Sequence, residues 1–180
     1  MLSEKINQRH VFYHADRAAS LQEYQEIKLD TDGLSYFGKA YWSVIQSKNI
    51  EEMNSAQKRE FYLEQIKNEP RYSLYASRMQ CIFGANSINE AIIFAESIAP
   101  RPNNPIPIIE VFAERFWTLD TNWLDYDNNQ MQLDYYRNYW DAIISNHCPQ
   151  VGQRRPPRLE VLMALPITTG KIVHIVPGQP

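Results

Sequence analysis

The chain has 180 residues, of which 44% are hydrophobic and 12% aromatic, and this is enough to bury one core of ordinary size. Its formal net charge of −3 provides no general attraction to polyphosphate, which disfavours a nucleic-acid-binding protein. It contains no run of about 18 apolar residues, and the polar start MLSEKINQRH lacks the apolar middle of a secretory signal. We therefore expect one cytoplasmic domain over residues 1–180.

The first third of the chain contains patterns typical of one strand and two or three helices. Aromatic and β-branched residues favour a pleated strand, and apolar residues that recur every three or four positions favour a helix. In chain order these patterns predict a strand at 11–15, a helix at 20–29 with Ser20 as its cap, a turn at 30–33, a short helix or ordered loop at 34–47, and a helix at 55–68 that Pro70 ends.

The rest of the chain mixes helices with strands. The predicted elements are a strand at 73–85, a helix from 88 after the capping box Ser87–Glu90, a proline-rich connection at 100–107, a strand at 108–116, a helix at 130–145, and two closing strands at 159–165 and 171–176 with PITTG between them. Strands and helices do not alternate regularly along the chain. This order predicts an α+β fold whose sheet is assembled from distant segments.

Four ionisable side chains stand inside apolar strand patterns, and they are the first candidates for a functional site. They are His14, Arg78, Glu110 and Glu160. A charged group that is buried without a partner costs free energy, so each of these residues either faces water or lines a cleft. No P-loop, GxGxxG, HExxH, GxSxG or CxxC motif is present. Composition and spacing alone do not decide whether these four side chains lie at the surface or line a cleft.

Three blocks, at residues 11–15, 77–98 and 158–176, follow one another along the chain. In this order they resemble the motifs of the ADP-ribosyltransferase superfamily. VFYHA, with Tyr13 and His14, resembles the first motif, a strand that ends in an aromatic residue and a histidine. SRMQCIFGANSINEAIIFAESI resembles the second, a strand ending in aromatic-Gly followed by a capped helix. RLEVLMALPITTGKIVHIV resembles the late strands of the DNA-modifying branch, in which a catalytic glutamate starts an apolar strand. Ser77-Arg78-x4-Phe83, Tyr139-Trp140 and Glu160-Val161-Leu162 also resemble a small uncharacterised bacterial family with this fold.

The resemblance implies two split, strongly curved sheets that hold NAD as a co-substrate, without a metal. It also implies a role for each matching residue. His14 would bond to the adenosine ribose, and Arg78 would contact the pyrophosphate. Phe83, or else Tyr13 or Tyr36, would stack on nicotinamide, and Glu160 would hold the 2′-hydroxyl of the nicotinamide ribose. When nicotinamide leaves, positive charge develops at the anomeric carbon, and a fixed carboxylate stabilises it. Glu160 is therefore the expected catalytic residue.

The resemblance implies mono-ADP-ribosylation of an acceptor, with a protein side chain as the first choice, by a bacterial effector or toxin that does not act at a membrane. Such a protein would be delivered into a target-cell cytosol without a classical signal peptide. No acidic residue stands two positions before Glu160, which disfavours the arginine-specific branch. A rifampicin-modifying relative would instead place an aspartate after a middle strand, and this makes Asp120 the second candidate for the catalytic carboxylate.

Several alternatives remain open at the level of sequence. A DNA or RNA acceptor could meet the arginines of residues 154–158 and the basic pair Lys58–Arg59. Antibiotic modification is a further possibility. From another class, the same fold could form a non-catalytic module that binds ADP-ribose or a protein. A related enzyme could instead hydrolyse NAD or remove a 2′-phosphate from RNA.

Overall fold

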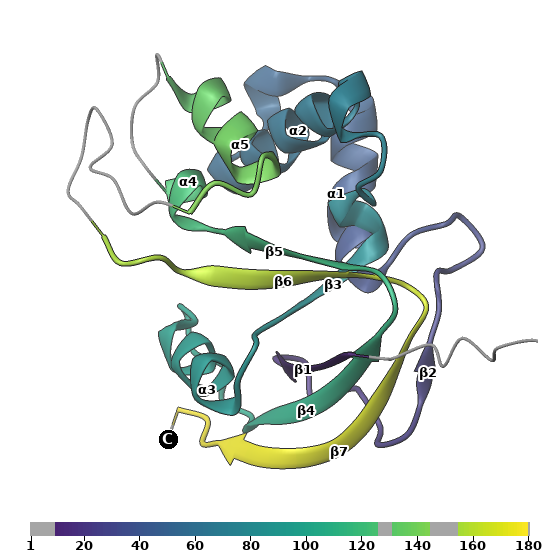
Figure 1. The fold of residues 1–180 in the computed structure, drawn as a ribbon, viewed down its shortest axis with the longest axis vertical. Coiled ribbons are helices and arrows are strands. Elements are labelled where there is room, and N and C mark those ends of the chain that lie inside the picture. The colour runs from purple at the N-terminus through teal and green to yellow at the C-terminus, as the bar shows by residue number, and fades with distance from the viewer. Residues whose placement is uncertain (1–9, 126–130, 145–154, 180) are drawn as a thin grey trace, which may run out of the picture. The chain divides into compact units, whose positions relative to one another are not determined.

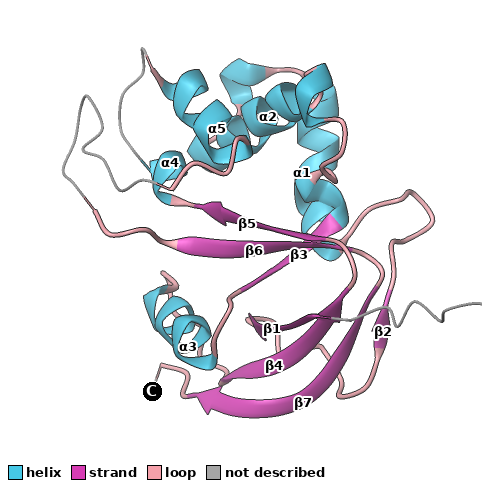
Figure 2. Cartoon of the chain, in the orientation of Figure 1, coloured by secondary structure: helices cyan, strands magenta, loops and turns pink. Residues whose placement is uncertain are grey.

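The structure, a computed structural model, describes residues 10–125, 131–144 and 155–179. The chain divides into two compact units, each built from separate segments. Unit 1 comprises residues 1–28, 83–116 and 163–180, and unit 2 comprises residues 29–82 and 117–162. Within the described residues there are five α-helices and seven strands, shown in Figure 2, so the predicted α+β class is confirmed. The specific ADP-ribosyltransferase fold and the single-domain organisation stay predictions.

The elements are distributed along the whole described chain. The strands are β1 (His10–Ala15), β2 (Glu26–Ile27), β3 (Cys81–Gly84), β4 (Ile106–Ala113), β5 (Phe116–Asp120), β6 (Leu159–Ala164) and β7 (Ile167–Val176). The α-helices are α1 (Tyr36–Ser47), α2 (Ser55–Lys67), α3 (Ile88–Ser97), α4 (Asn122–Asp125) and α5 (Gln132–Trp140). Single turns of 3-10 helix are η1 (Ile50–Glu52), η2 (Pro70–Tyr72) and η3 (Arg78–Gln80).

Unit 1 is organised around an antiparallel sheet with the order β1-β4-β7-β2. The central strand β4 pairs on both sides and is apolar along most of its length, as its sequence IPIIEVFA suggests. The β4–β7 ladder shifts register between Ile108 and Ile109 and again before Val111. Irregularities of this kind bend a strand pair, and Figure 1 shows the long curve of β4 and β7.

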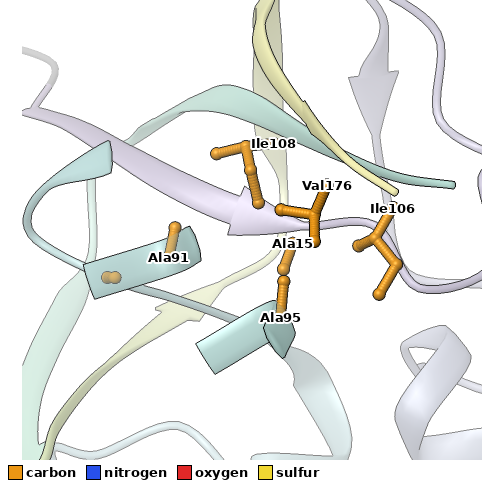
Figure 3. Packing of buried hydrophobic residues seen from close by; sticks show 7 residues of the cluster. Ala15, Ala91, Ala95, Ile106, Ile108 and Val176 are labelled. Carbon is orange, nitrogen blue, oxygen red and sulfur yellow. The ribbon is translucent and has the colours of Figure 1, made fainter. Parts of the chain in front are cut away.

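Helix α3 covers one face of this sheet. The capping box predicted from Ser87 and Glu90 is present, since each side chain accepts a hydrogen bond from a backbone N–H at the start of the helix. Figure 3 shows Ala91 and Ala95 turned towards the apolar residues of the sheet, among them Ile108. Because alanine is small, the helix can approach the sheet closely.

The helix predicted at 20–29 is wrong. Ala19 and Tyr24 have positive φ angles of 49° and 57°, which no α-helix contains. The backbone of Gln25 bonds instead to Thr169 of β7, 144 residues away, through both its N–H and its carbonyl. Pairing with β7 therefore overrides the local helical spacing. There is no helix for Ser20 to cap, and the N–H of Leu21 donates to Asp16 Oδ2 at 2.7 Å.

Unit 2 contains α1, α2, α4 and α5 (Figure 1). The ambiguous segment 34–47 forms helix α1, capped by Ser35, and the helix predicted at 55–68 is confirmed as α2. Trp140 of α5 is fully buried, and its ring N–H donates to the carbonyl of Leu63 in α2 at 3.0 Å. Gly38 of α1 lies so close to η3 that a Cβ there would come within 2.1 Å of the Met79 carbonyl oxygen.

The strand predicted at 73–85 is correct only for its last part. Residues 78–80 form η3, capped by Ser77, and β3 begins at Cys81. Strands β3, β6 and β5 form a second sheet in that order, and the division between the units falls within each of them. The helix predicted at 130–145 is observed at Gln132–Trp140, while residues 130 and 145 lie outside the described part.

Candidate functional site

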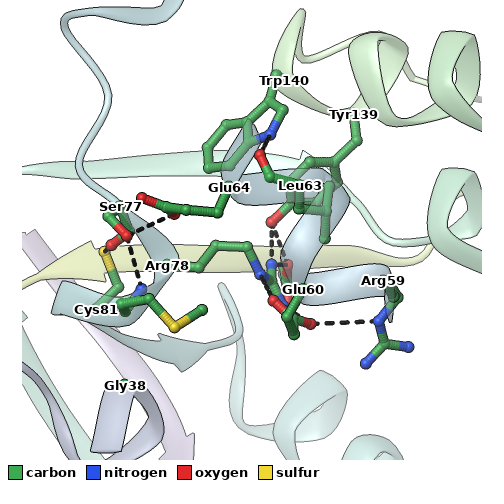
Figure 4. A network of polar contacts seen from close by, with 12 residues as sticks. Gly38, Arg59, Glu60, Leu63, Glu64, Ser77, Arg78, Cys81, Tyr139 and Trp140 are labelled. Atoms are coloured by element: carbon green, nitrogen blue, oxygen red, sulfur yellow. Dashed lines mark hydrogen bonds and ion pairs between the residues drawn. The ribbon is translucent and has the colours of Figure 1, made fainter. Parts of the chain in front are cut away.

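Arg78 is the centre of a buried polar cluster in unit 2, which comprises Glu60, Arg78, Tyr139 and Glu160 (Figure 4 shows its surroundings). Its Nε donates to Glu60 at 2.9 Å and its Nη1 to Glu160 at 2.6 Å. Its side chain is 6% exposed, and that of Glu60 is fully buried. Arg78 is carried by η3, and its side chain bonds to Glu60 of α2 and to Tyr139 of α5.

Glu160, at the start of β6, is held through one of its two oxygens. Its Oε1 accepts hydrogen bonds from Arg78 Nη1 and from the Tyr139 hydroxyl, both at 2.6 Å. The Tyr139 hydroxyl also accepts a hydrogen bond from Arg78 Nη1. No described residue bonds to Oε2, and 18% of the side chain is exposed. The carboxylate is thus anchored on one side and open on the other.

Burial and the charges of the cluster together set the protonation of Arg78 and Tyr139. Burial opposes the charge of Arg78, but Glu60, Tyr139 and Glu160 outweigh it, so that the pKa of the guanidinium is raised further above its ordinary value. Burial raises the pKa of the Tyr139 hydroxyl well above 10, although Arg78 opposes this shift. Tyr139 therefore keeps its proton at any physiological pH and can donate it to Glu160.

Glu64 is a second buried carboxyl on α2, one turn after Glu60. Its Oε2 accepts a hydrogen bond from the Ser77 hydroxyl at 2.7 Å. Burial raises the pKa of Glu64, and the bond from Ser77 only partly offsets this. The native state therefore binds the proton of Glu64 more tightly than the unfolded chain does. The contribution of Glu64 to the free energy of unfolding is fully present below its ordinary pKa and is lost as the pH rises through the raised pKa.

Glu64→Gln is expected to make the protein more stable than wild type at about pH 8 and equally stable at about pH 4, because the amide accepts from Ser77 without a buried charge. Urea unfolding at the two pH values measures the difference. Glu51→Gln, at an exposed position, serves as the control and should change neither value. A variant less stable than wild type at the higher pH would show that Arg78 stabilises the Glu64 charge by more than burial costs.

His14 lies in unit 1, together with Phe83 and Tyr13. Its Nδ1 donates to the Phe83 carbonyl at 2.6 Å, because a carbonyl oxygen can only accept. Burial lowers the pKa of His14 more than the Phe83 carbonyl and Asp16 raise it, so the ring is neutral at neutral pH. In this tautomer Nε2 is an acceptor, and no described residue bonds to it.

The aromatic candidates differ in their placement. Tyr13 and His14 are neighbours on β1 and point to opposite faces of the sheet, and Tyr13 packs against the cluster of Ala91 and Ala95. Tyr36 is 84% exposed at the start of α1. Phe83 is half-buried at the end of β3.

Two of the acidic candidates take part in hydrogen bonds of the backbone. Asp120 is fully buried, and its Oδ1 accepts the N–H groups of Asn122 and Arg158 at 3.0 and 3.1 Å. This shielding favours Glu160 over Asp120 as a carboxylate that can meet a ligand. Glu110 lies in β4 and accepts the N–H of Lys171 at 3.3 Å.

Two residues near Arg78 were missed in the sequence. Glu60 stands within the apolar stripe of α2, three positions before Leu63, and a carboxylate at such a position signals a buried partner. The sequence analysis named Tyr36 as an aromatic candidate and not its neighbour Phe37. The spacing of Phe37 to Tyr41 and Ile45 places it on the inner face of α1. The Phe37 ring centre lies 5.8 Å from Arg78 Cζ.

No protein-family model matches the chain, and no curated protein matches it either. Among the described residues, no three His, Cys, Asp or Glu side chains are grouped so that they could hold a metal ion. None of the helices in residues 10–125, 131–144 and 155–179 is long and apolar enough to cross a membrane.

Proposed function

We propose that the protein is an NAD-dependent mono-ADP-ribosyltransferase with Glu160 as its catalytic carboxylate. The observation that carries the proposal is the state of this side chain. A buried arginine and a buried tyrosine hold Oε1, while Oε2 has no partner among the described residues. Oε2 is thereby left available to accept a hydrogen bond from a sugar hydroxyl, which the proposed reaction requires.

In the proposed reaction the bond between the anomeric carbon and the nicotinamide nitrogen breaks, and its electron pair leaves with nicotinamide. An acceptor oxygen or nitrogen then bonds to the anomeric carbon and releases its proton. Glu160 Oε2 would accept a hydrogen bond from the 2′-hydroxyl of the same ribose. Its negative charge would stabilise the positive charge that develops at the anomeric carbon. The carboxylate acts without forming a covalent bond.

The family resemblance assigns His14 to the adenosine ribose of NAD. Because its Nδ1 proton is committed to the Phe83 carbonyl, Nε2 can accept a hydrogen bond from a hydroxyl of the adenosine ribose. Burial keeps the ring neutral, and an imidazolium could not accept this bond. Phe83 is the first choice for stacking on nicotinamide, and Tyr13 and Tyr36 are the second choices. The net charge of −3 favours a protein acceptor over DNA or RNA.

The test incubates the purified protein with NAD and a cell lysate. Release of nicotinamide and a mass increase of about 541 on acceptor molecules, the mass of a transferred ADP-ribosyl group, are expected. Nicotinamide release without an adduct would support NAD hydrolysis. A protein that binds ADP-ribose but releases no nicotinamide would favour the second candidate, a binding module.

A further inference from the structure

We infer that Arg78 and Tyr139 are positioning residues that hold Glu160 in one orientation, and that Arg78 does not contact the diphosphate of NAD. The role in catalysis rests on the proposed function, but the geometry of the contacts does not. The inference gives a role to Tyr139, which the family resemblance named without one, and it changes the role expected for Arg78.

The N–H groups of Arg78 are committed to protein acceptors. Nε and Nη2 face the two oxygens of Glu60 at 2.9 and 3.5 Å, and Nη1 donates to Glu160 and Tyr139. A guanidinium has five N–H groups in a rigid fork, and these four contacts use both edges that pair with planar anions. A bidentate diphosphate contact would require one carboxylate to be displaced. Since Glu60 is fully buried, its charge would be left with Arg59, at 3.3 Å and from a more exposed position, in place of its main cation.

Tyr139 completes the hold on Glu160. Its hydroxyl accepts from Arg78, so its single proton is left for Glu160 Oε1, to which it donates at 2.6 Å. A donor that is itself polarised by a cation makes a stronger hydrogen bond in a buried setting. Two donors that converge on one oxygen prevent the carboxylate from rotating, and Oε2 is thereby kept in a constant direction. A carboxylate that is held in this way loses little entropy when a ligand hydroxyl binds it.

Tyr139→Phe removes the hydrogen bond to Glu160 and keeps the buried ring. We expect the kcat for nicotinamide release to fall by about tenfold to a hundredfold, while the KM for NAD changes less than about twofold. Tyr72→Phe is the matched control, because Tyr72 is also buried in unit 2 and donates to a carboxylate, Asp141, at 2.9 Å. It should lose similar stability and keep kcat. An equal loss of kcat in both variants, or a rise in KM alone, would overturn the inference.

A second measurement does not depend on activity. With 3-fluorotyrosine at position 139, Glu160→Gln is expected to shift the fluorine NMR signal, because a neutral amide replaces the charged acceptor. The same label at position 72 should not respond, since Tyr72 bonds to Asp141 instead. An unchanged signal at 139 would refute the hold on Glu160. If the substitution shifts the signal but the wild-type protein releases no nicotinamide from NAD, the proposed function is refuted and the hold on Glu160 is supported.

Discussion

Glu160→Gln is expected to lower the rate of nicotinamide release by about 10²–10³-fold, the usual effect of removing one preorganised electrostatic contact in a transition state. The affinity for NAD should change little, because glutamine can still bond a ribose hydroxyl in the ground state. Steady-state kinetics and calorimetric titration with NAD measure the two quantities. The substitution also leaves Arg78 with one fewer charged acceptor, so the thermal midpoint is measured alongside.

Glu69→Gln is the control for this experiment. Glu69 is another carboxylate of unit 2 that an arginine holds, with Arg137 Nη2 at 3.0 Å. Within the described part of the chain it does not bond to any member of the Arg78 cluster. Its replacement should leave the reaction rate unchanged. If Glu160→Gln retained full activity and Asp120→Asn lost it, the role of the catalytic carboxylate would pass to Asp120.

Arg78→Ala is expected to destabilise the protein by about 3–5 kcal/mol, the cost of breaking a buried ion pair by removing one partner. Glu60 would keep its charge inside the core without its main cation, because the neighbouring Arg59 reaches it only at 3.3 Å and from a more exposed position. Urea unfolding measures the loss. If the variant is too unstable to purify, Arg78→Met combined with Glu60→Leu removes both charges and should recover most of the stability.

Arg158→Ala provides the comparison for a surface pair. Arg158 bonds to Asp125, but its side chain is 61% exposed, and a pair of this kind contributes less than about 1 kcal/mol. The contrast separates the two roles considered for Arg78. An arginine that served mainly as a diphosphate ligand would leave the stability of the alanine variant near that of wild type and weaken NAD binding. That outcome would restore the role implied by the family resemblance.

Local sequence patterns were sufficient where an element is stabilised by its own residues. The capping box of Ser87 and Glu90 predicted the start of α3, and the apolar spacing of residues 55–68 predicted α2. The apolar strand patterns predicted β1, β4 and β6, and with them the α+β class. In each case the deciding contacts lie within one turn of helix or along one strand, so they can be recognised from neighbouring residues.

Long-range contacts decided the remaining features. Residues 20–29 have helical spacing, yet the backbone of Gln25 bonds to Thr169 and the segment lies at the edge of the sheet. Arg78 was recognised as an ionisable residue in an apolar segment, but its partners Glu60 and Glu160 stand 18 and 82 positions away along the chain. Periodicity reports which face of an element is apolar and does not report what packs there. For this reason the residues of the candidate site could be named from the sequence, whereas the commitment of Arg78 to protein carboxylates emerged only from the folded chain.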